Sequence, residues 1–392
     1  MIAFSHFKKV LIMFLAIFIV IFSLSAPYST GNIDRLAYVI ALGLDVGDNN
    51  DLKLSVQLSK PDNSSGGSSG NSYEEITNAV NCSSIDEGIS LLNSYISRRI
   101  NLSHCKVLVI SEELASKGIS DYIYTLFNNT GMSAHASMIV SKIPAYEFLD
   151  ISKPELESLL SGYYESSLVS NEYTAYIQNV SLIKFFSDSV DSFTQPVAVL
   201  GSMSDLPIQS SNNTEKMGLA VFKYDKLVGE LTGLETICHM IISNELKSCT
   251  ISIPNPLGDS ETINLIIKLN NNCNNSVDII NGTPHISSKI KINAKITSTT
   301  KESTVDSTNY YKKENTELIE SACNEYLEKN IINYLYKTSK NYQSDIDGFG
   351  KYAVKYFYTL QDWEEYNWLE NYHNSIFNVE VETTLKSGYS FL

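Results

Sequence analysis

Basic residues are scarce in this sequence. The 392-residue chain has 29 lysines and arginines against 44 aspartates and glutamates, which gives a formal net charge of −15 at pH 7. Because proteins bind nucleic acids through clusters of Lys and Arg that neutralise phosphates, this balance excludes nucleic acid as a partner. Hydrophobic residues make up 43% of the chain and charged residues 19%, so the chain is expected to fold rather than to stay disordered.

Long apolar runs are equally scarce, and this excludes a protein with many membrane spans. The one such run is Val10 to Phe22, which follows Lys8 and Lys9 and precedes Ser23-Leu24-Ser25-Ala26-Pro27. A short basic patch, an apolar core and small residues are typical of an export signal. Residues 1–26 are therefore predicted to be a signal or membrane-anchor segment. The sequence leaves open whether this segment stays as an uncleaved anchor or is cut at a nearby small residue.

Metal-binding patterns are missing. The six cysteines include no C-x-x-C pair and the six histidines no H-E-x-x-H motif, so no metal site is predicted. An even number of cysteines in an exported chain leaves disulfides open. However, Cys105 precedes the pattern of a buried strand and Cys323 lies on the apolar face of a helix pattern, so free, buried cysteines are favoured. The cysteines are Cys82, Cys105, Cys238, Cys249, Cys273 and Cys323.

Residues 27–202 show the alternation of strands and helices that is typical of α/β folds. Strand patterns at 36–46 and 52–58 flank an acidic turn whose spacing does not match a calcium-binding EF-hand loop. Capping boxes at Ser84–Glu87 and Ser152–Glu155 each predict the start of a helix. A helix-backed sheet is therefore expected here, as one region or as two subdomains.

Two polar segments interrupt these patterns. Residues 203–217 are rich in Ser and Asn and are predicted to link the two halves of the chain. Residues 61–72 have the composition of a flexible loop. Within that loop, Gly66-Gly67-Ser68-Ser69-Gly70 has the letters of G-x-S-x-G but lacks the strand-to-helix turn that a catalytic nucleophile needs.

Residues 218–392 are expected to form an α+β domain. A hairpin from Gly218 to Gly229 comes first, and a capping box at Thr232–Glu235 predicts a helix after it. Alternating apolar residues predict strands at 263–269, 290–296 and 377–385. Apolar residues at four-residue steps predict a long helix over 318–334. The prediction is a mainly antiparallel sheet covered by a long helix.

Residues 345–368 contain several side chains that could bind a metal or a ligand. For each of them a purely structural role is also possible. Asp345 and Asp347 are spaced to bind a metal, but a turn or capping role is favoured. Trp363 and Trp368 are suited to stacking on a sugar or a lipid headgroup, but core packing is favoured for at least one of them. Gly348-Phe349-Gly350-Lys351 lacks the spacing of a phosphate-binding loop. The sequence therefore predicts no catalytic, cofactor-binding or metal-binding residue.

Four segments carry a resemblance to a known family. They are Asp34 to Asp45, His104 to Ala115 with Gly118-Ile119 after it, the Gly218 to Gly229 hairpin, and the tail from Asp347-Gly348-Phe349-Gly350 through Trp363 and Trp368 to Gly388. In this order they resemble the spore germination receptor C-subunit family, also written Ger(x)C, and they cover nearly the whole chain.

The resemblance implies a mixed α/β protein of about three domains without enzymatic activity or cofactor. Members of the family are usually lipoproteins on the outer face of the inner spore membrane. They assemble with an A subunit and a permease-like B subunit into a nutrient-germinant receptor. This chain departs from the pattern at Pro27, which stands where the family has its acylated cysteine. Lipidation is therefore not expected at this position, and an apolar anchor in its place remains one of the two alternatives given above.

The expected function is thus that of a non-enzymatic, membrane-anchored C subunit of a germinant receptor. One alternative is an exported solute-binding module with a preformed pocket between domains. The other is a cell-wall hydrolase, which would need two close carboxylates or a metal in one cleft.

Overall fold

The structure, a computed structural model, describes residues 35–48, 51–59, 75–129, 131–153, 157, 159–169, 171–203, 214–258, 262–299, 310 and 312–386. In the leading segment it describes Met13, Leu15 and Phe18, each in helical conformation. The predictions for the signal segment, for Pro27, for the loop at 61–72 and for most of the 203–217 linker lie outside the described residues. Among the described residues, no helix has the length and apolar composition needed to cross a membrane.

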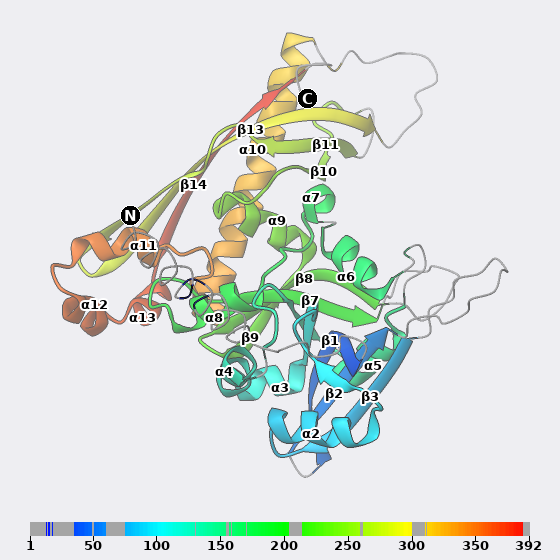
Figure 1. Ribbon diagram of the computed structural model, residues 1–392. Coiled ribbons are helices and arrows are strands. Elements are labelled where there is room, and N and C mark those ends of the chain that lie inside the picture. The colour runs from blue at the N-terminus through cyan, green and yellow to red at the C-terminus, as the bar shows by residue number, and fades with distance from the viewer. Residues whose placement is uncertain are drawn as a thin grey trace, which may run out of the picture. The chain divides into compact units, whose positions relative to one another are not determined.

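A nine-stranded sheet spans the first half of the chain. Its strands are β1 Leu36–Val46, β2 Leu52–Ser59, β3 Glu75–Cys82, β4 Arg99–Asn101, β5 Val107–Ser111, β6 Ser137–Ser141, β7 Val197–Met203, β8 Thr214–Lys223 and β9 Lys226–Leu231. The spatial order is β3-β2-β1-β5-β6-β7-β8-β9, with the short β4 beside β1. Figure 1 shows β1, β2 and β3 next to one another, and likewise β7, β8 and β9. Strands β1, β5, β6 and β7 run parallel, and antiparallel strands flank them on both sides.

Helices accompany this sheet along the chain. They are α2 Ile85–Tyr95, α3 Glu112–Lys117, α4 Ser120–Asn129, α5 Ala145–Ile151, α6 Leu160–Val169, α7 Asn171–Thr174, α8 Leu182–Val190 and α9 Gly233–Ile242. Strands β5 and β6 are buried along their whole length. Such burial is typical of parallel strands that have helices on both faces, so the predicted helix-backed sheet is confirmed.

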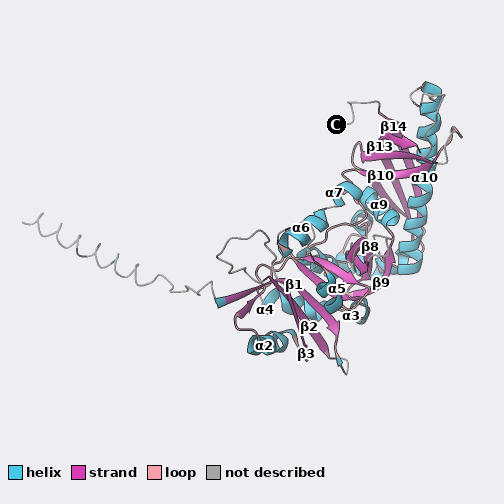
Figure 2. Cartoon of the chain, turned by 90° about the vertical axis from the view of Figure 1, so that its right-hand side faces the viewer, coloured by secondary structure: helices cyan, strands magenta, loops and turns pink. Residues whose placement is uncertain are grey.

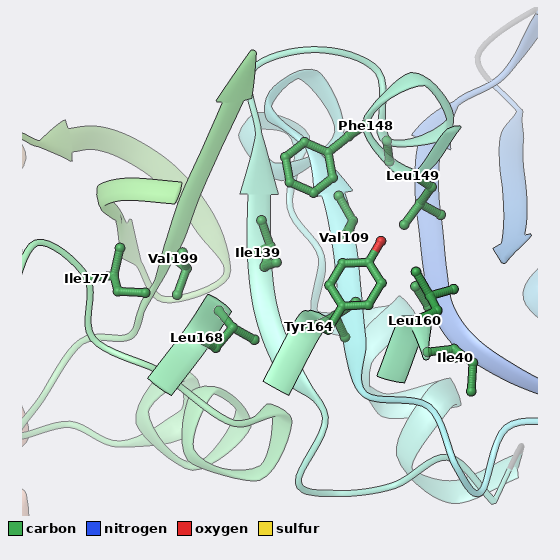
Figure 3. Packing of buried hydrophobic residues seen from close by; sticks show 13 residues of the cluster. Ile40, Val109, Ile139, Phe148, Leu149, Leu160, Tyr164, Leu168, Ile177 and Val199 are labelled. Atoms are coloured by element: carbon green, nitrogen blue, oxygen red, sulfur yellow. The ribbon is translucent and has the colours of Figure 1, made fainter. Parts of the chain in front are cut away.

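The core of the first sheet lies between its parallel strands and the helices α5 and α6 (Figure 3). Phe148 of α5 and Tyr164 of α6 belong to one buried cluster with Ile139 of β6. The Tyr164 hydroxyl donates to Gln57 Oε1 at 2.8 Å, and Gln57 Nε2 donates to the Leu149 carbonyl at 2.8 Å. The Gln57 amide and the Tyr164 hydroxyl are therefore paired inside this core, and they tie β2 to both helices.

The helix starts agree with the predicted capping boxes at two of three places. The boxes at Ser84 and Thr232 precede α2 and α9 as predicted. The prediction at Ser152 is wrong, because its N–H donates to the Phe148 carbonyl and ends α5. The buried Ser152 hydroxyl lies 3.0 Å from the Thr214 hydroxyl of β8. The four-residue capping motif gives no information about this contact with a distant strand. The contact therefore could not be predicted from the motif.

The hairpin of β8 and β9 joins the first sheet, whereas the sequence analysis assigned it to the C-terminal half. Strand β8 pairs antiparallel with β7, from Val197 opposite Val221 to Met203 opposite Thr214. The alternation that predicts a hairpin defines its two strands but not the sheet edge with which they pair. The first sheet therefore continues past the predicted linker to Leu231.

The last part of the described chain forms a second sheet with a long helix beside it, as predicted. It contains β10 Cys249–Pro254, β11 Thr262–Leu269, β12 Asn274–Ile280, β13 Thr283–Thr299, α10 Lys313–Tyr336 and β14 Ile376–Leu385. The order β10-β11-β13-β12 is antiparallel throughout, and β14 pairs in parallel with β13. Helix α10 has 24 residues and continues into six residues of π-helix, Lys337–Tyr342. Figure 2 shows α10 running alongside the sheet that contains β10, β13 and β14. Shorter helices precede β14: α11 Gly350–Ala353, a 3-10 turn Val354–Tyr356, α12 Leu360–Tyr366 and α13 Trp368–Tyr372.

Side chains of α10 close the outer edge of β14. Backbone N–H groups of alternate β14 residues donate to side-chain oxygens spaced four residues apart on the helix. The pairs are Val381 to Glu328 at 2.9 Å, Thr383 to Asn324 at 2.8 Å and Leu385 to Glu320 at 2.7 Å. Four helix residues rise by about 6 Å and two strand residues span about 6.6 Å, so the two spacings match. With its donors occupied, this edge cannot pair with a further strand.

Asn324→Ala removes one acceptor from this ladder. We expect the free energy of unfolding to fall by about 1 kcal/mol, because the Thr383 N–H loses its hydrogen bond. Amide hydrogen exchange at Thr383 should accelerate in the same variant. Glu325→Ala, at an exposed position of the same helix, is the control and should change neither quantity. Unchanged exchange at Thr383 in the Asn324 variant would contradict the ladder.

Candidate functional site

Buried polar side chains collect where the segment after α10 meets the first sheet. We call this group the junction, and it consists of His239, Tyr334, Asp345, Asp347 and Trp368. Helix α9 supplies His239, α10 supplies Tyr334, α13 begins with Trp368, and the two aspartates lie in the loop before α11. All five residues are buried.

His239 and Asp347 form the centre of the junction. His239 Nδ1 lies 2.8 Å from Asp347 Oδ1 and 3.1 Å from the Tyr334 hydroxyl. The Tyr334 hydroxyl donates to Asp347 Oδ2 at 2.7 Å, so both oxygens of this carboxylate accept a hydrogen bond. Burial, together with the charge of Asp347, raises the pKa of Tyr334 well above its usual value, which keeps the phenol as a donor.

A residue of the first half holds the other side of the His239 ring. His239 Nε2 lies 3.0 Å from Gln178 Oε1, and Gln178 Nε2 donates to Glu245 Oε2 at 2.5 Å. The bond to Glu245 turns the amide oxygen of Gln178 toward the ring. Each nitrogen of His239 therefore faces an oxygen atom of a neighbouring side chain.

Asp345 organises the loop beside this pair. Its carboxylate accepts from the backbone N–H groups of Phe349 at 3.1 Å and Gly350 at 2.8 Å, and from Trp368 Nε1 at 2.8 Å. The favoured capping role is thereby confirmed for Asp345. Burial, with a smaller contribution from the charge of Asp347, raises the pKa of Asp345 to about 7.

The glycines of the Gly348-Phe349-Gly350 motif serve close packing. Gly348 has φ = +72°, a left-handed conformation that favours glycine. A Cβ on Gly350 would lie 2.8 Å from the Phe193 carbonyl oxygen and 2.9 Å from its Cα. The motif thus lets this loop lie directly against the chain that precedes β7.

Both tryptophans pack inside the protein. Trp363 and Trp368 are 2% and 3% exposed and stack with ring centroids 5.7 Å apart. Trp363 Nε1 donates to the Ser192 hydroxyl at 3.1 Å. Asn367, with φ = +48°, separates α12 from α13, and this break lets residues five positions apart face each other. Core packing is therefore confirmed for both.

Further hydrogen bonds join the segment around the junction to the first sheet. The Ser344 hydroxyl donates to the Phe222 carbonyl at 2.6 Å, and the Tyr342 hydroxyl donates to the Glu230 carbonyl at 2.9 Å. Lys337 Nζ pairs with Glu235 Oε2 at 2.8 Å. These contacts attach the end of α10 to the β8–β9 hairpin and to the first turn of α9.

Hydrogen bonds within the protein occupy the two carboxylates of the junction. Every carboxylate oxygen of Asp345 and Asp347 accepts a hydrogen bond within the protein. Over the described residues, no group of three or more His, Cys, Asp or Glu is arranged to hold a metal ion. The six cysteines are all free and buried, as favoured from the sequence, and burial raises the pKa of Cys105 to about 12.

The sequence analysis identified the aspartates, glycines and tryptophans of this region but missed His239, Tyr334 and Gln178. His239 lies 108 positions before Asp347, and Gln178 lies a further 61 positions before His239, so no local pattern connects them. Tyr334 lies only 13 positions before Asp347, but its place in the helix pattern gives no sign of this contact. One signal was present: His239 stands within Ile237-Cys238-His239-Met240-Ile241, an otherwise apolar run. A histidine inside such a run needs a buried polar partner.

Both halves of the chain match families of spore germination proteins. Residues 30–203 match the family described as spore germination protein N-terminal domain, and residues 217–388 match the family described as spore germination B3/GerAC like, C-terminal. YfkR of Bacillus subtilis (strain 168), whose name assigns it to spore germination, is 23% identical over 376 residues, which cover 93% of either chain. The crystal structure of the GerBC protein covers 88% of this chain and 97% of its own, with a TM-score of 0.54 at 13% identity, and so shares the fold.

Asp345→Asn tests the buried carboxyl of the junction through pH. Because the folded-state pKa of about 7 exceeds the unfolded value of about 3.9, the folded protein binds the proton more tightly. Asp345 therefore lowers the stability of the wild type as pH rises from about 4 to about 7, by at most about 1.4 kcal/mol per pH unit. The variant lacks this loss, so its free energy of unfolding relative to wild type should rise over that range and level off above it.

Guanidinium unfolding at a series of pH values measures this difference. Glu364→Gln, at an exposed position of α12, is the control and should follow the wild-type curve. A difference between the Asp345 variant and wild type that does not change with pH would contradict the raised pKa.

Proposed function

This chain belongs to the GerAC family of spore germination proteins, as a receptor C component, and we propose that it is the non-enzymatic C subunit of a nutrient-germinant receptor. The observation that carries the proposal is the pair of family matches, which follow one another along the chain and together span both halves. The GerBC likeness adds that the fold extends over the same length.

The junction supports a role without catalysis. A carboxylate that acts as general acid or base on a substrate must be free to contact it. In the junction, the side chains of Asp345 and Asp347 are instead buried, and each carboxylate oxygen accepts a hydrogen bond from a donor of the protein. The function of this polar cluster is to hold the second sheet on the first.

We place the protein at the outer face of the spore inner membrane, held by its first 26 residues. The run from Val10 to Phe22 is apolar and follows Lys8 and Lys9, which remain in the cytoplasm under the positive-inside rule. Pro27 cannot be acylated, so the apolar run itself provides the anchor in this proposal.

Coupling to the A and B subunits needs a surface for them, and residues 352–360 offer one. Tyr358 is fully exposed and Leu360 is 62% exposed, and Tyr352 and Tyr356 nearby are each more than one-third exposed. Exposed apolar and tyrosine side chains that lie together are typical of protein interfaces. We propose that this segment contacts a receptor partner.

Spores that lack the gene should fail to release dipicolinate in response to one class of nutrient, and the intact gene should restore the response. A gene without codons 2–26 should not restore it. A Tyr358→Ser, Leu360→Ser double variant should restore less than the intact gene and should co-purify less A and B subunit from spore membranes. Tyr173→Ser, which removes a tyrosine that is 76% exposed elsewhere on the chain, is the control for loss of surface aromatics.

Two results would contradict these proposals separately. A normal response of the deletion spores to every nutrient would count against the receptor role. Full restoration by the gene without codons 2–26 would count against the anchor and leave the receptor role standing.

A further inference from the structure

A cleft of about 690 Å³ lies at the carboxyl ends of the central parallel strands. It is lined by the end of β1, by Ser111 and the first residues of α3 after β5, and by Ser141 and the first residues of α5 after β6. The volume is within the range of small-molecule sites, which is about 300 to 1,000 Å³.

The strand order makes this edge of the sheet a natural place for a ligand. After β1 the chain turns to β2 on one side, whereas after β5 it passes through α3 and α4 to β6 on the other side. The chain thus leaves two adjacent parallel strands in opposite directions. In open α/β sheets, ligands bind outside the carboxyl ends of the strands at such a point.

Two serine hydroxyls of this cleft lack a partner among the residues that the structure describes. Ser111 Oγ and Ser141 Oγ are both buried and make no hydrogen bond within that part of the chain. The two residues lie directly opposite each other in the β5–β6 register. A buried hydroxyl without a partner lowers stability, and two side by side in the lining of a cleft indicate that a bound molecule supplies the missing bonds.

The charged groups of the cleft have both signs, and some of them are unpaired. Lys53 Nζ lies over the Tyr146 ring, 4.6 Å from its centroid, and has no carboxylate partner among the described residues. Glu112 and Glu147 likewise have no cation partner in the described part of the chain, whereas Lys117 and Lys142 are already paired with Glu113 and Glu230.

We propose that this cleft binds a small zwitterion, a free amino acid or a short peptide. Lys53 would receive the carboxylate of the ligand, and Glu112 and Glu147 would receive its ammonium group. The hydroxyls of Ser111 and Ser141 would complete the hydrogen bonds of the bound molecule. Neither a simple anion nor a simple cation satisfies both sets of unpaired charges, which is why the zwitterion fits best.

Asp45 shapes the cleft without taking part in binding. Its Oδ1 accepts from the Ala145 N–H at 2.5 Å and its Oδ2 accepts from the Tyr146 N–H at 2.9 Å. Both oxygens are therefore occupied, and they fix the start of α5, on which Glu147 lies.

The test is the thermal unfolding of the full chain in detergent, followed by tryptophan fluorescence. The probes are the common free amino acids one at a time, glycylglycine and trialanine, each at millimolar concentration. At least one should raise the melting temperature, because a ligand that binds only the folded state stabilises it. Its N-acetyl and methyl-ester forms, which each lack one charge, should raise it less. Comparison of the free amino acids with the two peptides distinguishes the two sources of the zwitterion.

Serine variants then locate the site. Ser111→Ala and Ser141→Ala remove hydroxyls that have no partner, so the variants should melt no lower than wild type without ligand, and they should lose most of the ligand-induced shift. Ser55→Ala is the matched control, since Ser55 Oγ is also buried and unpartnered in the same sheet but does not line the cleft. Glu147→Gln, at an exposed position, provides a second variant that leaves the core untouched.

Three results would overturn the proposal: no probe raises the melting temperature, the blocked forms raise it as much as the zwitterion, or the shift persists in the serine and Glu147 variants. None of these results bears on the receptor role, because germination and partner binding are measured separately.

Discussion

The contact between His239 and Asp347 determines how the two sheets are held together. These residues are 108 positions apart and form a buried pair, 2.8 Å between nitrogen and oxygen. Removing charged or strongly polar groups from water is unfavourable unless each of them is paired. Once α9 has packed on the first sheet with His239 inside, Asp347 has to be brought to it, and with it come α10 and the loop that carries Asp345.

The neighbouring interactions follow from the same constraint. Tyr334 and Gln178 complete the hydrogen bonds of the pair from two sides. Asp345 then fixes the loop by accepting from two backbone N–H groups and from Trp368. At the other end of α10, the ladder of side-chain acceptors sets the position of β14. Polar contacts of defined geometry thus hold α10 near both of its ends.

Much of the fold could be predicted from the sequence, because its signals are local. The alternation at 263–269 and 377–385 and the four-residue steps of α10 depend on neighbours along the chain, and these predictions are confirmed. Features that depend on long-range contacts could not be predicted. The predicted helix start at Ser152 was wrong, and Ser152 instead ends α5 and contacts Thr214. The pairing of the β8–β9 hairpin with β7 is likewise a long-range contact that the local pattern does not specify. The same limit applies to the junction, whose aspartates were identified while the partners His239 and Tyr334 were not.

The central claim is that the junction makes the two sheets unfold as one unit, and Asp347→Ala tests it most directly. The only tryptophans of the chain, Trp363 and Trp368, report the junction by fluorescence, and amide exchange at Val109 and Ile139 reports the first sheet. In denaturant, wild type should lose both signals at one midpoint. The variant should lose fluorescence first, while the amides of β5 and β6 stay protected. If the variant loses both signals together at the wild-type midpoint, the pair does not join the two sheets and the account is wrong.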